Sequence, residues 1–125
     1  MNKLFIAVGA VALLAAGSAS AQDVAAGEKS FNKCKACHSV VAGKNGVGPS
    51  LFGVYGRKVG EAANYKYSDA HLASGLVWND ENLDKYITDP KATIPGNKMV
   101  FAGIKDAEER KNLIDTIIGG TEETT

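Results

Sequence analysis

The sequence predicts an all-α domain in which a few short helices are joined by long irregular loops. Apolar residues recur at helical spacing in short segments, and several of these segments begin with a residue that commonly caps a helix. The stretch between the first two segments is rich in glycine and lacks the alternation typical of a strand. The chain has 125 residues and no internal repeat, which leaves room for one domain and a short processing segment.

Residues 1–21 are predicted to be a signal peptide that is cleaved after Ala21. Lys3 supplies a positive charge, and residues 4–16 form an uncharged apolar run of 13 residues. This run is shorter than the roughly 18 residues of a spanning helix, and the Ala-Ser-Ala ending suits a signal peptidase. An uncleaved membrane anchor is the alternative. We therefore expect export, most simply to a bacterial periplasm, and a mature domain of residues 22–125 without stable membrane insertion.

The composition excludes several classes of protein. Lysine plus arginine and aspartate plus glutamate each number 14, so the chain lacks the basic excess of a nucleic-acid-binding protein. Three prolines and the absence of any biased tract argue against a disordered or fibrous chain. Two cysteines are too few for a disulfide-stapled scaffold.

The first helix of the mature chain is predicted over residues 23–35. Asp23 can cap it, and Gly27, Phe31 and Cys34 fall on one face. Residues 39–64 then contain six glycines and one proline, and we expect a long irregular loop. A loop of this length inside a small domain usually wraps a ligand or has a function of its own.

Two short helices follow. Ser68 is expected to cap a helix that ends near residue 74, and Asn79 is expected to start another that ends near residue 88. Pro90 would end the second helix, because proline cannot donate the helical hydrogen bond. Residues 89–104 are again expected to be irregular.

The last helix is predicted over residues 106–118. Its first turn is acidic, and two adjacent glycines, Gly119 and Gly120, are expected to stop it. Its apolar stripe consists of Leu113, Ile114, Ile117 and Ile118.

These elements bury too little apolar surface for a domain of about a hundred residues. The core is therefore expected to contain something apolar that is not protein, and a cofactor would supply it.

The motif that carries the chemistry is Cys34-Lys35-Ala36-Cys37-His38, at the end of the first predicted helix. In an exported protein, this spacing is typical of covalent attachment of a c-type haem. Two thiols three positions apart can reach two vinyl groups of one porphyrin edge, and the next imidazole can bind iron. Three alternatives remain open: a thioredoxin-like redox pair, a structural zinc site and a plain disulfide.

Met99 is the candidate for the sixth iron ligand, because it is the only methionine of the mature chain. It follows an irregular stretch that contains Pro95 and Gly96, and such a loop can present a thioether to a ring face. His71 lies among polar residues and is expected to be a surface or hydrogen-bonded histidine. Ligation by His38 and Met99 leaves no open position on iron, and a weak methionine donor favours the ferrous state. The sequence therefore predicts a one-electron carrier and not an enzyme.

Two other functions compete with this interpretation. With Met99 dissociated, the iron would be open, as in a haem sensor or a peroxidase-like protein. Without haem, Cys34 and Cys37 would form the redox pair of a thiol–disulfide oxidoreductase.

From Gly27 to about Ile118 the chain resembles a class I cytochrome c, and within that class the bacterial cytochrome c2 branch related to mitochondrial cytochrome c. The resemblance implies a cytochrome c fold, in which a few short helices and long loops wrap one covalently bound haem. Beyond the haem motif, it rests on the order and spacing of Gly48-Pro49, Phe52-Gly53, Tyr55-Gly56-Arg57, Tyr67-Ser68-Asp69-Ala70, Gly75-Leu76-Val77-Trp78, Tyr86, Asp89-Pro90-Lys91 and residues 94–103.

The resemblance also implies roles for residues around the haem. The Pro49 carbonyl would accept a hydrogen bond from His38 Nδ1, and Tyr86 would lie near the Met99 sulfur. Asn97 stands where the family commonly has a threonine beside a propionate, and its amide could donate there. His71 stands where the family often has an asparagine. The residues expected to donate hydrogen bonds around the propionates are Arg57, Tyr67 and Trp78.

The implied partners are membrane redox complexes. A cytochrome bc complex would supply electrons, and a photosynthetic reaction centre or a terminal oxidase would take them up. The carrier is expected to work as a monomer and to dock through lysines around the exposed haem edge. These lysines are Lys33, Lys35, Lys91, Lys98 and Lys105.

Overall fold

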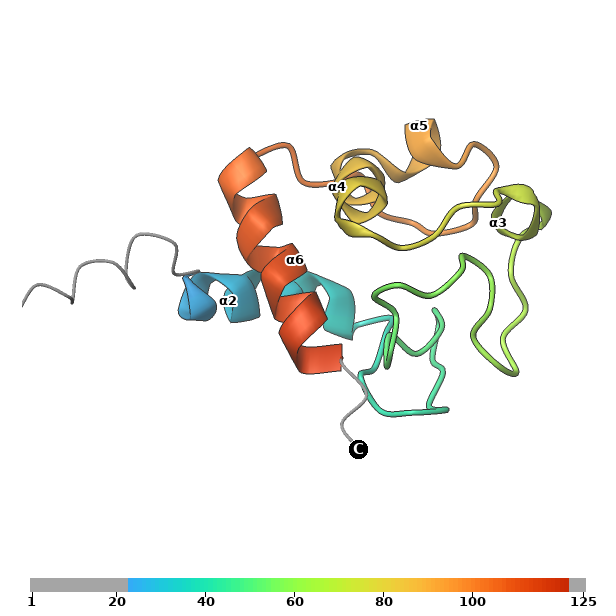
Figure 1. The fold of residues 1–125 in the computed structure, drawn as a ribbon, viewed down its shortest axis with the longest axis horizontal. Helices are drawn as coiled ribbons and strands as arrows, with labels where there is room; N and C mark the ends of the chain where they lie inside the picture. Colours follow the sequence, from blue (N-terminus) through green and yellow to red (C-terminus); the bar gives the residue numbers. More distant parts are fainter. Residues whose placement is uncertain (1–22, 122–125) are drawn as a thin grey trace, which may run out of the picture.

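The computed structural model describes residues 23–121, and the predicted signal peptide lies outside this range. Figure 1 shows the helices α2 (Val24–Lys35), α3 (Asp69–Ala73), α4 (Asp80–Thr88), α5 (Pro90–Thr93) and α6 (Ala107–Thr121). The described residues form no sheet, and Lys58 and Val77 form an isolated β-bridge. The predicted all-α fold is confirmed. Within the described range, no helix has the length and apolar character needed to cross a membrane.

Three predicted caps are present. The Asp23 carboxylate accepts a hydrogen bond from the Ala26 amide at 2.9 Å, and Ser68 Oγ accepts one from the His71 amide at 3.1 Å. The Asn79 side chain does the same for the Asn82 amide at 2.8 Å. Each of these bonds satisfies an amide that the first turn of a helix leaves without a partner.

Two details differ from the sequence prediction. Residues 90–93 form the short helix α5, which Asp89 caps and in which Pro90 occupies the first turn. Proline favours that position, because its missing N–H has no helical partner there. Helix α6 also continues through Gly119 and Gly120 to Thr121. A glycine costs only about 1 kcal/mol relative to alanine inside a helix, so a glycine pair does not stop a helix by itself.

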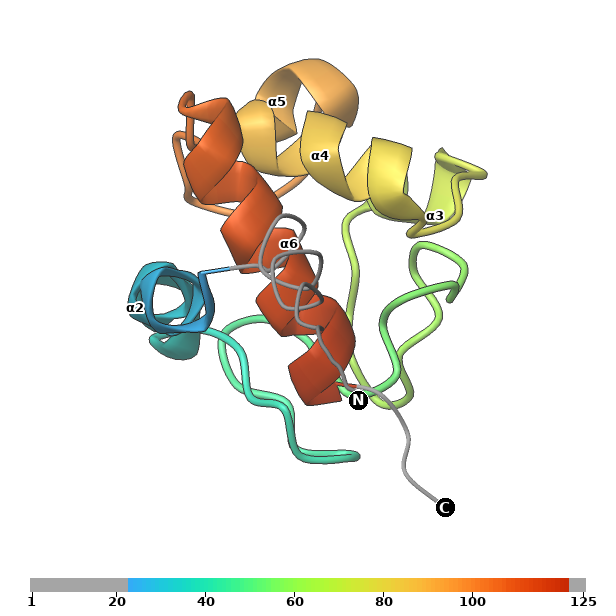
Figure 2. The ribbon, with the colours of Figure 1, turned by 60° about the vertical axis from the view of Figure 1, so that its left-hand side comes forward.

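The first and last helices cross each other and form the framework of the fold. Figures 1 and 2 show α2 against the middle of α6, and α4 against the N-terminal part of α6. Gly27 and Phe31 are buried on α2, and Leu113 on α6 is 0% exposed. On the outer side of the crossing, Glu109 accepts hydrogen bonds from Ser30 Oγ at 2.7 Å and from Lys33 Nζ at 2.8 Å.

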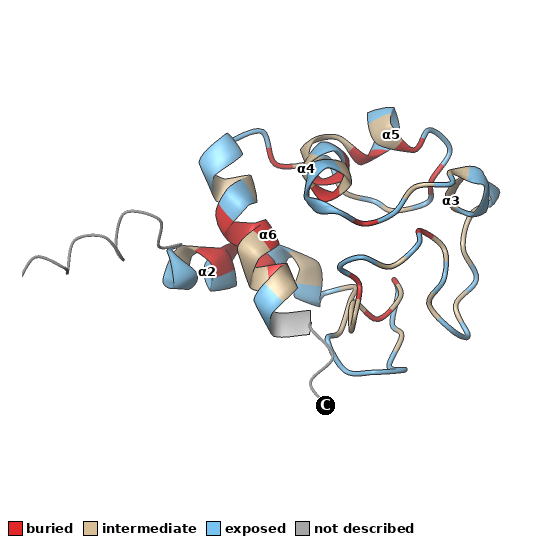
Figure 3. Ribbon diagram, viewed as in Figure 1, coloured by how far each residue is buried: buried red, intermediate tan, exposed pale blue. Residues whose placement is uncertain are grey.

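The buried residues lie mainly on the helices. Figure 3 shows them where α2 and α6 cross and on α4, while the long loop between α2 and α3 is mostly exposed or half-buried. The loops therefore form the wall of a space that the helices alone do not close. The buried apolar residues are Phe31, Val54, Val59, Trp78, Leu83, Tyr86, Ile87, Ile94, Ile104, Leu113, Ile114 and Ile117.

The segment that leads from Met99 to α6 lies against the end of α4, and Gly103 makes this approach possible. Gly103 has a φ of 104°, and a Cβ added there would lie 2.1 Å from the Thr88 carbonyl oxygen. The next residue, Ile104, is buried, and its amide donates to the Ile87 carbonyl at 2.8 Å.

Replacing Gly103 with alanine should lower the free energy of unfolding by about 2 kcal/mol or more, because a strained backbone conformation costs of the order of 1–3 kcal/mol and a backbone clash is added. Denaturant unfolding followed by far-ultraviolet circular dichroism measures the change. Gly119→Ala is the matched control, since a Cβ at Gly119 meets no atom within 4 Å. Alanine at that helical position should leave stability unchanged or raise it. Equal stability of Gly103→Ala and the unmodified protein would contradict the role of Gly103.

Candidate functional site

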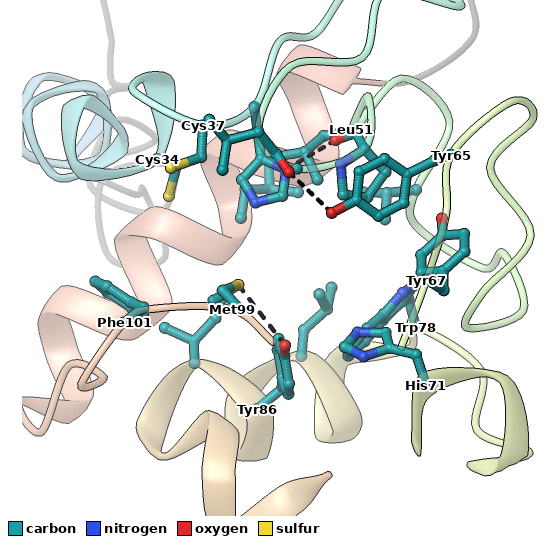
Figure 4. Close-up of a pocket in the computed structure, with 18 of the residues that line it drawn as sticks. Cys34, Cys37, Leu51, Tyr65, Tyr67, His71, Trp78, Tyr86, Met99 and Phe101 are labelled. Atoms are coloured by element: carbon teal, nitrogen blue, oxygen red, sulfur yellow. Dashed lines mark hydrogen bonds between the residues drawn. The ribbon is translucent and has the colours of Figure 1, made fainter. Parts of the chain in front are cut away.

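A cavity lies between the long loop that joins α2 to α3, the segment after α5, and the helices α4 and α6. Protein atoms leave about 1280 Å³ of space there, part of it open to solvent. Figure 4 shows Cys37 and Leu51 along one edge of this cavity and Met99, Tyr86 and His71 along the opposite edge. Much of the wall is apolar. These apolar lining residues include Val54, Leu83, Ile87, Phe101, Leu113 and Ile117.

Both cysteines line the cavity from the end of α2 as free thiols. Burial raises the pKa of the Cys34 thiol to about 11, and the nearby Lys33 charge lowers it only in part. Redox-active thiols work as thiolates and need a depressed pKa. Burial thus gives Cys34 the opposite of the activation that a redox-active thiol needs.

His38 follows Cys37 and is held in one orientation. Its Nδ1 lies 2.7 Å from the Pro49 carbonyl oxygen, as the family resemblance implies. Because a carbonyl can only accept, Nδ1 carries the proton and Nε2 keeps the lone pair that a metal would use. Gly48 lies against the ring, since a Cβ there would lie 2.4 Å from His38 Cε1.

Met99 reaches the same cavity from the segment after α5. The Tyr86 hydroxyl donates to the Met99 sulfur at 3.7 Å, which agrees with the position that the resemblance implies for Tyr86. Burial raises the pKa of the Tyr86 phenol, so this hydroxyl keeps its proton at neutral pH.

Asn97 lies behind the cavity wall and not in it. Its amide donates to the carbonyls of Pro90 at 2.9 Å and Ile94 at 2.8 Å. Its oxygen accepts from the Met99 amide at 2.8 Å. Both amide hydrogens are thus committed to the backbone, and the side chain fixes the loop that presents Met99. It leaves no hydrogen for the propionate bond that the resemblance suggested.

The three residues expected around the propionates all line the cavity. Arg57 donates through its two terminal nitrogens to the Phe52 carbonyl at 2.9 Å and the Ser50 carbonyl at 3.2 Å. Its buried Nε has no hydrogen-bond partner. The Tyr67 hydroxyl accepts from the Ala62 amide at 2.9 Å, so its own hydrogen remains available, and Trp78 is buried in the same wall.

The charge of the cavity wall points to an anionic occupant. Lys33, Arg57 and Lys98 line the cavity, and none of the described residues that line it is an aspartate or a glutamate. A buried guanidinium without a full set of partners is costly unless an acceptor is supplied. An apolar ring that carries carboxylates would supply both the filling and the acceptor.

His71, which the sequence predicts to be a surface or hydrogen-bonded histidine, lines the cavity, and Ser68 Oγ lies 3.3 Å from its Nδ1. It lies one helical turn after its cap, Ser68, and is half-buried. The sequence could not predict that His71 faces the cavity, because a helix as short as α3 has no apolar stripe to mark its inner side.

The residues present fit a covalently bound haem. Two thiols lie at one edge of an apolar cavity, and a histidine with a free Nε2 and a methionine thioether reach into the same space. Arg57, whose Nε has no hydrogen-bond partner, and the cations Lys33 and Lys98 line the cavity and could hold the propionates.

Comparison with known proteins agrees with this geometry. The family model for Cytochrome c matches residues 24–115. Cytochrome c2 iso-2 of Magnetospirillum molischianum is 61% identical over 85 residues, which cover 68% of this chain and 88% of the relative. Cytochrome c-550 of Bradyrhizobium diazoefficiens is 57% identical over 90 residues, which cover 71% of this chain and 66% of the relative.

A solved structure supports the same fold. Cytochrome cH from Methylobacterium extorquens superposes with a TM-score of 0.72 at 49% identity, covering 78% of this chain and 98% of the neighbour. The expected cytochrome c fold is thereby confirmed. The chain belongs to the class I cytochromes c, in their bacterial cytochrome c2 branch, and carries one covalently bound haem c.

Proposed function

We propose that this chain, as a cytochrome c electron carrier and not an enzyme, carries single electrons in the periplasm, with its haem attached to Cys34 and Cys37 and its iron held by His38 and Met99. The observation that carries this proposal is that the free Nε2 of His38 and the Met99 thioether both belong to residues that line one cavity.

Haem c supplies a one-electron couple when bound. The protein's own residues set the conditions for it. Pro49 fixes the tautomer of His38, and Asn97 fixes the backbone of Met99. With both side chains as ligands, no position stays open for oxygen or a substrate. The apolar wall excludes water, and Arg57, Tyr67 and Trp78 offset the propionate charge.

The Tyr86 hydroxyl tunes the methionine ligand. It donates to the Met99 sulfur and so withdraws electron density from it. A weaker donor on iron favours the ferrous form, which corresponds to a higher potential.

The proposed docking face includes residues of the cavity. Lys33 and Lys98 line the cavity, as does Val100, which is 97% exposed. Lys33 is paired with Glu109, so part of its charge is offset. Lys35, Lys91 and Lys105 are exposed and complete the proposed set.

The carboxylates of membrane redox complexes would meet this face. By the family resemblance, the donor is a cytochrome bc complex and the acceptor a photosynthetic reaction centre or a terminal oxidase. We extend the proposal to the chain ends: residues 1–21 direct export and are removed, and residues 22–125 act as a monomeric domain.

The visible spectrum of the reduced protein tests whether the iron has an open position. The reduced unmodified protein should show sharp low-spin c-type bands that carbon monoxide does not move. Met99→Ala should keep the covalent haem but bind carbon monoxide after reduction, since the sixth position is then open. Val100→Ala is the control, because it changes the neighbouring exposed side chain only.

Each alternative predicts a different spectrum. Carbon monoxide binding by the unmodified protein would favour a sensor or a peroxidase-like protein with Met99 dissociated. A colourless protein, purified from a host able to attach haem, would leave the thiol–disulfide oxidoreductase.

The midpoint potential tests the role of the Tyr86 hydroxyl. Tyr86→Phe keeps the ring but removes the hydrogen bond to the Met99 sulfur. The sulfur becomes a stronger donor, and the midpoint potential should fall. Spectroelectrochemical titration measures it, with Tyr55→Phe as the control at an exposed tyrosine that does not line the cavity. An unchanged or raised potential in Tyr86→Phe would contradict the tuning role.

The salt dependence of electron transfer tests the basic docking face. The rate of electron transfer to a detergent-solubilised acceptor complex should fall as salt is added, because screening weakens attraction between opposite charges. Lys98→Gln should lower the rate several-fold at low ionic strength and reduce this salt dependence. Lys111→Gln is the control, since Lys111 lies on α6, pairs with Asp115 and does not line the cavity. A rate that is constant or rises with salt would argue against the basic docking face.

A further inference from the structure

His71 is a titratable group in the cavity wall that the proposed function does not use. It projects from α3, and Figure 4 shows it between Tyr67 and Tyr86. Its ring stacks on Tyr67 with centroids 5.7 Å apart and meets Tyr86 edge-on at 5.8 Å. Since the Tyr86 hydroxyl contacts the Met99 sulfur, one aromatic ring separates His71 from that sulfur.

The surroundings of His71 can hold both of its protonation states. Ser68 Oγ lies 3.3 Å from His71 Nδ1. A serine hydroxyl has one hydrogen and two lone pairs. It can donate to the bare Nδ1 of a neutral imidazole, and it can accept from the Nδ1–H of an imidazolium while still accepting the His71 amide. Protonation therefore requires no rearrangement of the helix cap.

The charges that face His71 are cations and phenols. Burial lowers the pKa of His71, and the Lys98 ammonium from the Met99 segment lowers it further. Arg57 lines the same cavity from the long loop, as does Tyr65. Asp69, on α3 itself, is exposed and does not line the cavity.

The neighbouring phenols remain neutral. Burial raises the pKa values of Tyr67, from the loop, and of Tyr86, from α4. No carboxylate of the described residues lines the cavity, so any negative charge beside His71 in the cavity belongs to the cavity's occupant. The proton affinity of His71 must respond to any change of charge at the cavity's occupant.

We propose that His71 is a redox-linked proton site: it takes up a proton when the protein accepts an electron and releases it when the electron leaves. This inference rests on the proposed function. The electron would come from the donor protein, and haem c would supply the one-electron couple that accepts it. The proton comes from solvent and forms one N–H bond at the His71 imidazole, and no other bond changes. The added negative charge stabilises the imidazolium that the oxidised cavity disfavours.

The sign of the pH dependence follows. Reduction raises the pKa of His71, so the imidazole binds a proton more tightly in the reduced protein than in the oxidised protein. Between the two pKa values, the midpoint potential falls as pH rises, and outside them it is flat. Burial and Lys98 lower the pKa in the oxidised protein. The slope should therefore begin below the ordinary histidine value of about 6.5.

The test is the midpoint potential of the haem-loaded protein from about pH 4 to about pH 8, the range in which histidines titrate. At a fixed solution potential, the ratio of reduced to oxidised protein should fall about threefold to tenfold across the His71 titration. This change corresponds to about 30–60 mV at 59 mV per tenfold for one electron. His71→Asn and His71→Gln should remove this slope. Leu72→Ala, an exposed neighbour on α3, should keep it.

Two further measurements separate a proton site from a structural role. Lys98→Gln removes the cation that lowers the pKa of His71, so the slope should move to higher pH. Proton NMR titration of the imidazole should give a higher pKa in the ferrous than in the ferric protein. Equal pKa values in the two states, or an undiminished slope in both His71 variants, would overturn the proposal and assign the slope to another group, such as a propionate.

Failure of this inference is distinguishable from failure of the proposed function. Low-spin bands that carbon monoxide does not move, together with a flat potential, would reject only the proton site. Loss of the low-spin spectrum in the unmodified protein would reject His38 and Met99 ligation first.

Discussion

The apolar cavity is the constraint on which the rest of the structure depends. Two crossing helices and α4 bury one modest core, and the loops between them close around a space that the chain does not fill. Leu113 shows the connection, because it belongs both to the α2–α6 crossing and to the cavity wall. A covalently bound apolar ring completes this core. Loss of the ring should therefore weaken the helix framework as well as the site.

The two sides of the cavity are held by different means. His38 is fixed by one hydrogen bond to the Pro49 carbonyl and by contact with Gly48, both in the long loop that follows the attachment motif. Met99 comes from a distant segment, in which the buried Asn97 side chain donates to the carbonyls of Pro90 and of Ile94, the C-cap of α5, and accepts from the Met99 amide. His38 is adjacent to the attachment motif in the sequence, whereas Met99 reaches the same cavity only in the folded chain.

This difference explains what could be predicted from the sequence. The helix caps and the Cys-x-x-Cys-His motif involve neighbours in the chain, so local patterns were sufficient, and the tyrosine beside the Met99 sulfur followed from the family resemblance. The sequence does not predict helix α5, because Pro90 suits both the end of α4 and the first turn of a new helix. The place of His71 in the cavity wall could not be predicted, because Tyr67 and Tyr86 meet its ring only in the folded chain.

The absence of carboxylates among the described cavity residues links electron transfer to acid–base chemistry. Arg57 and Lys98 suit the propionates of a bound ring, and the same positive wall disfavours a second cation on His71. A neutral side chain at that position would avoid the conflict altogether. While His71 is neutral, it adds no positive charge to the cavity. Its ionisation equilibrium therefore depends on the charge at the iron. The features that retain the haem therefore also make the proton affinity of His71 sensitive to the redox state.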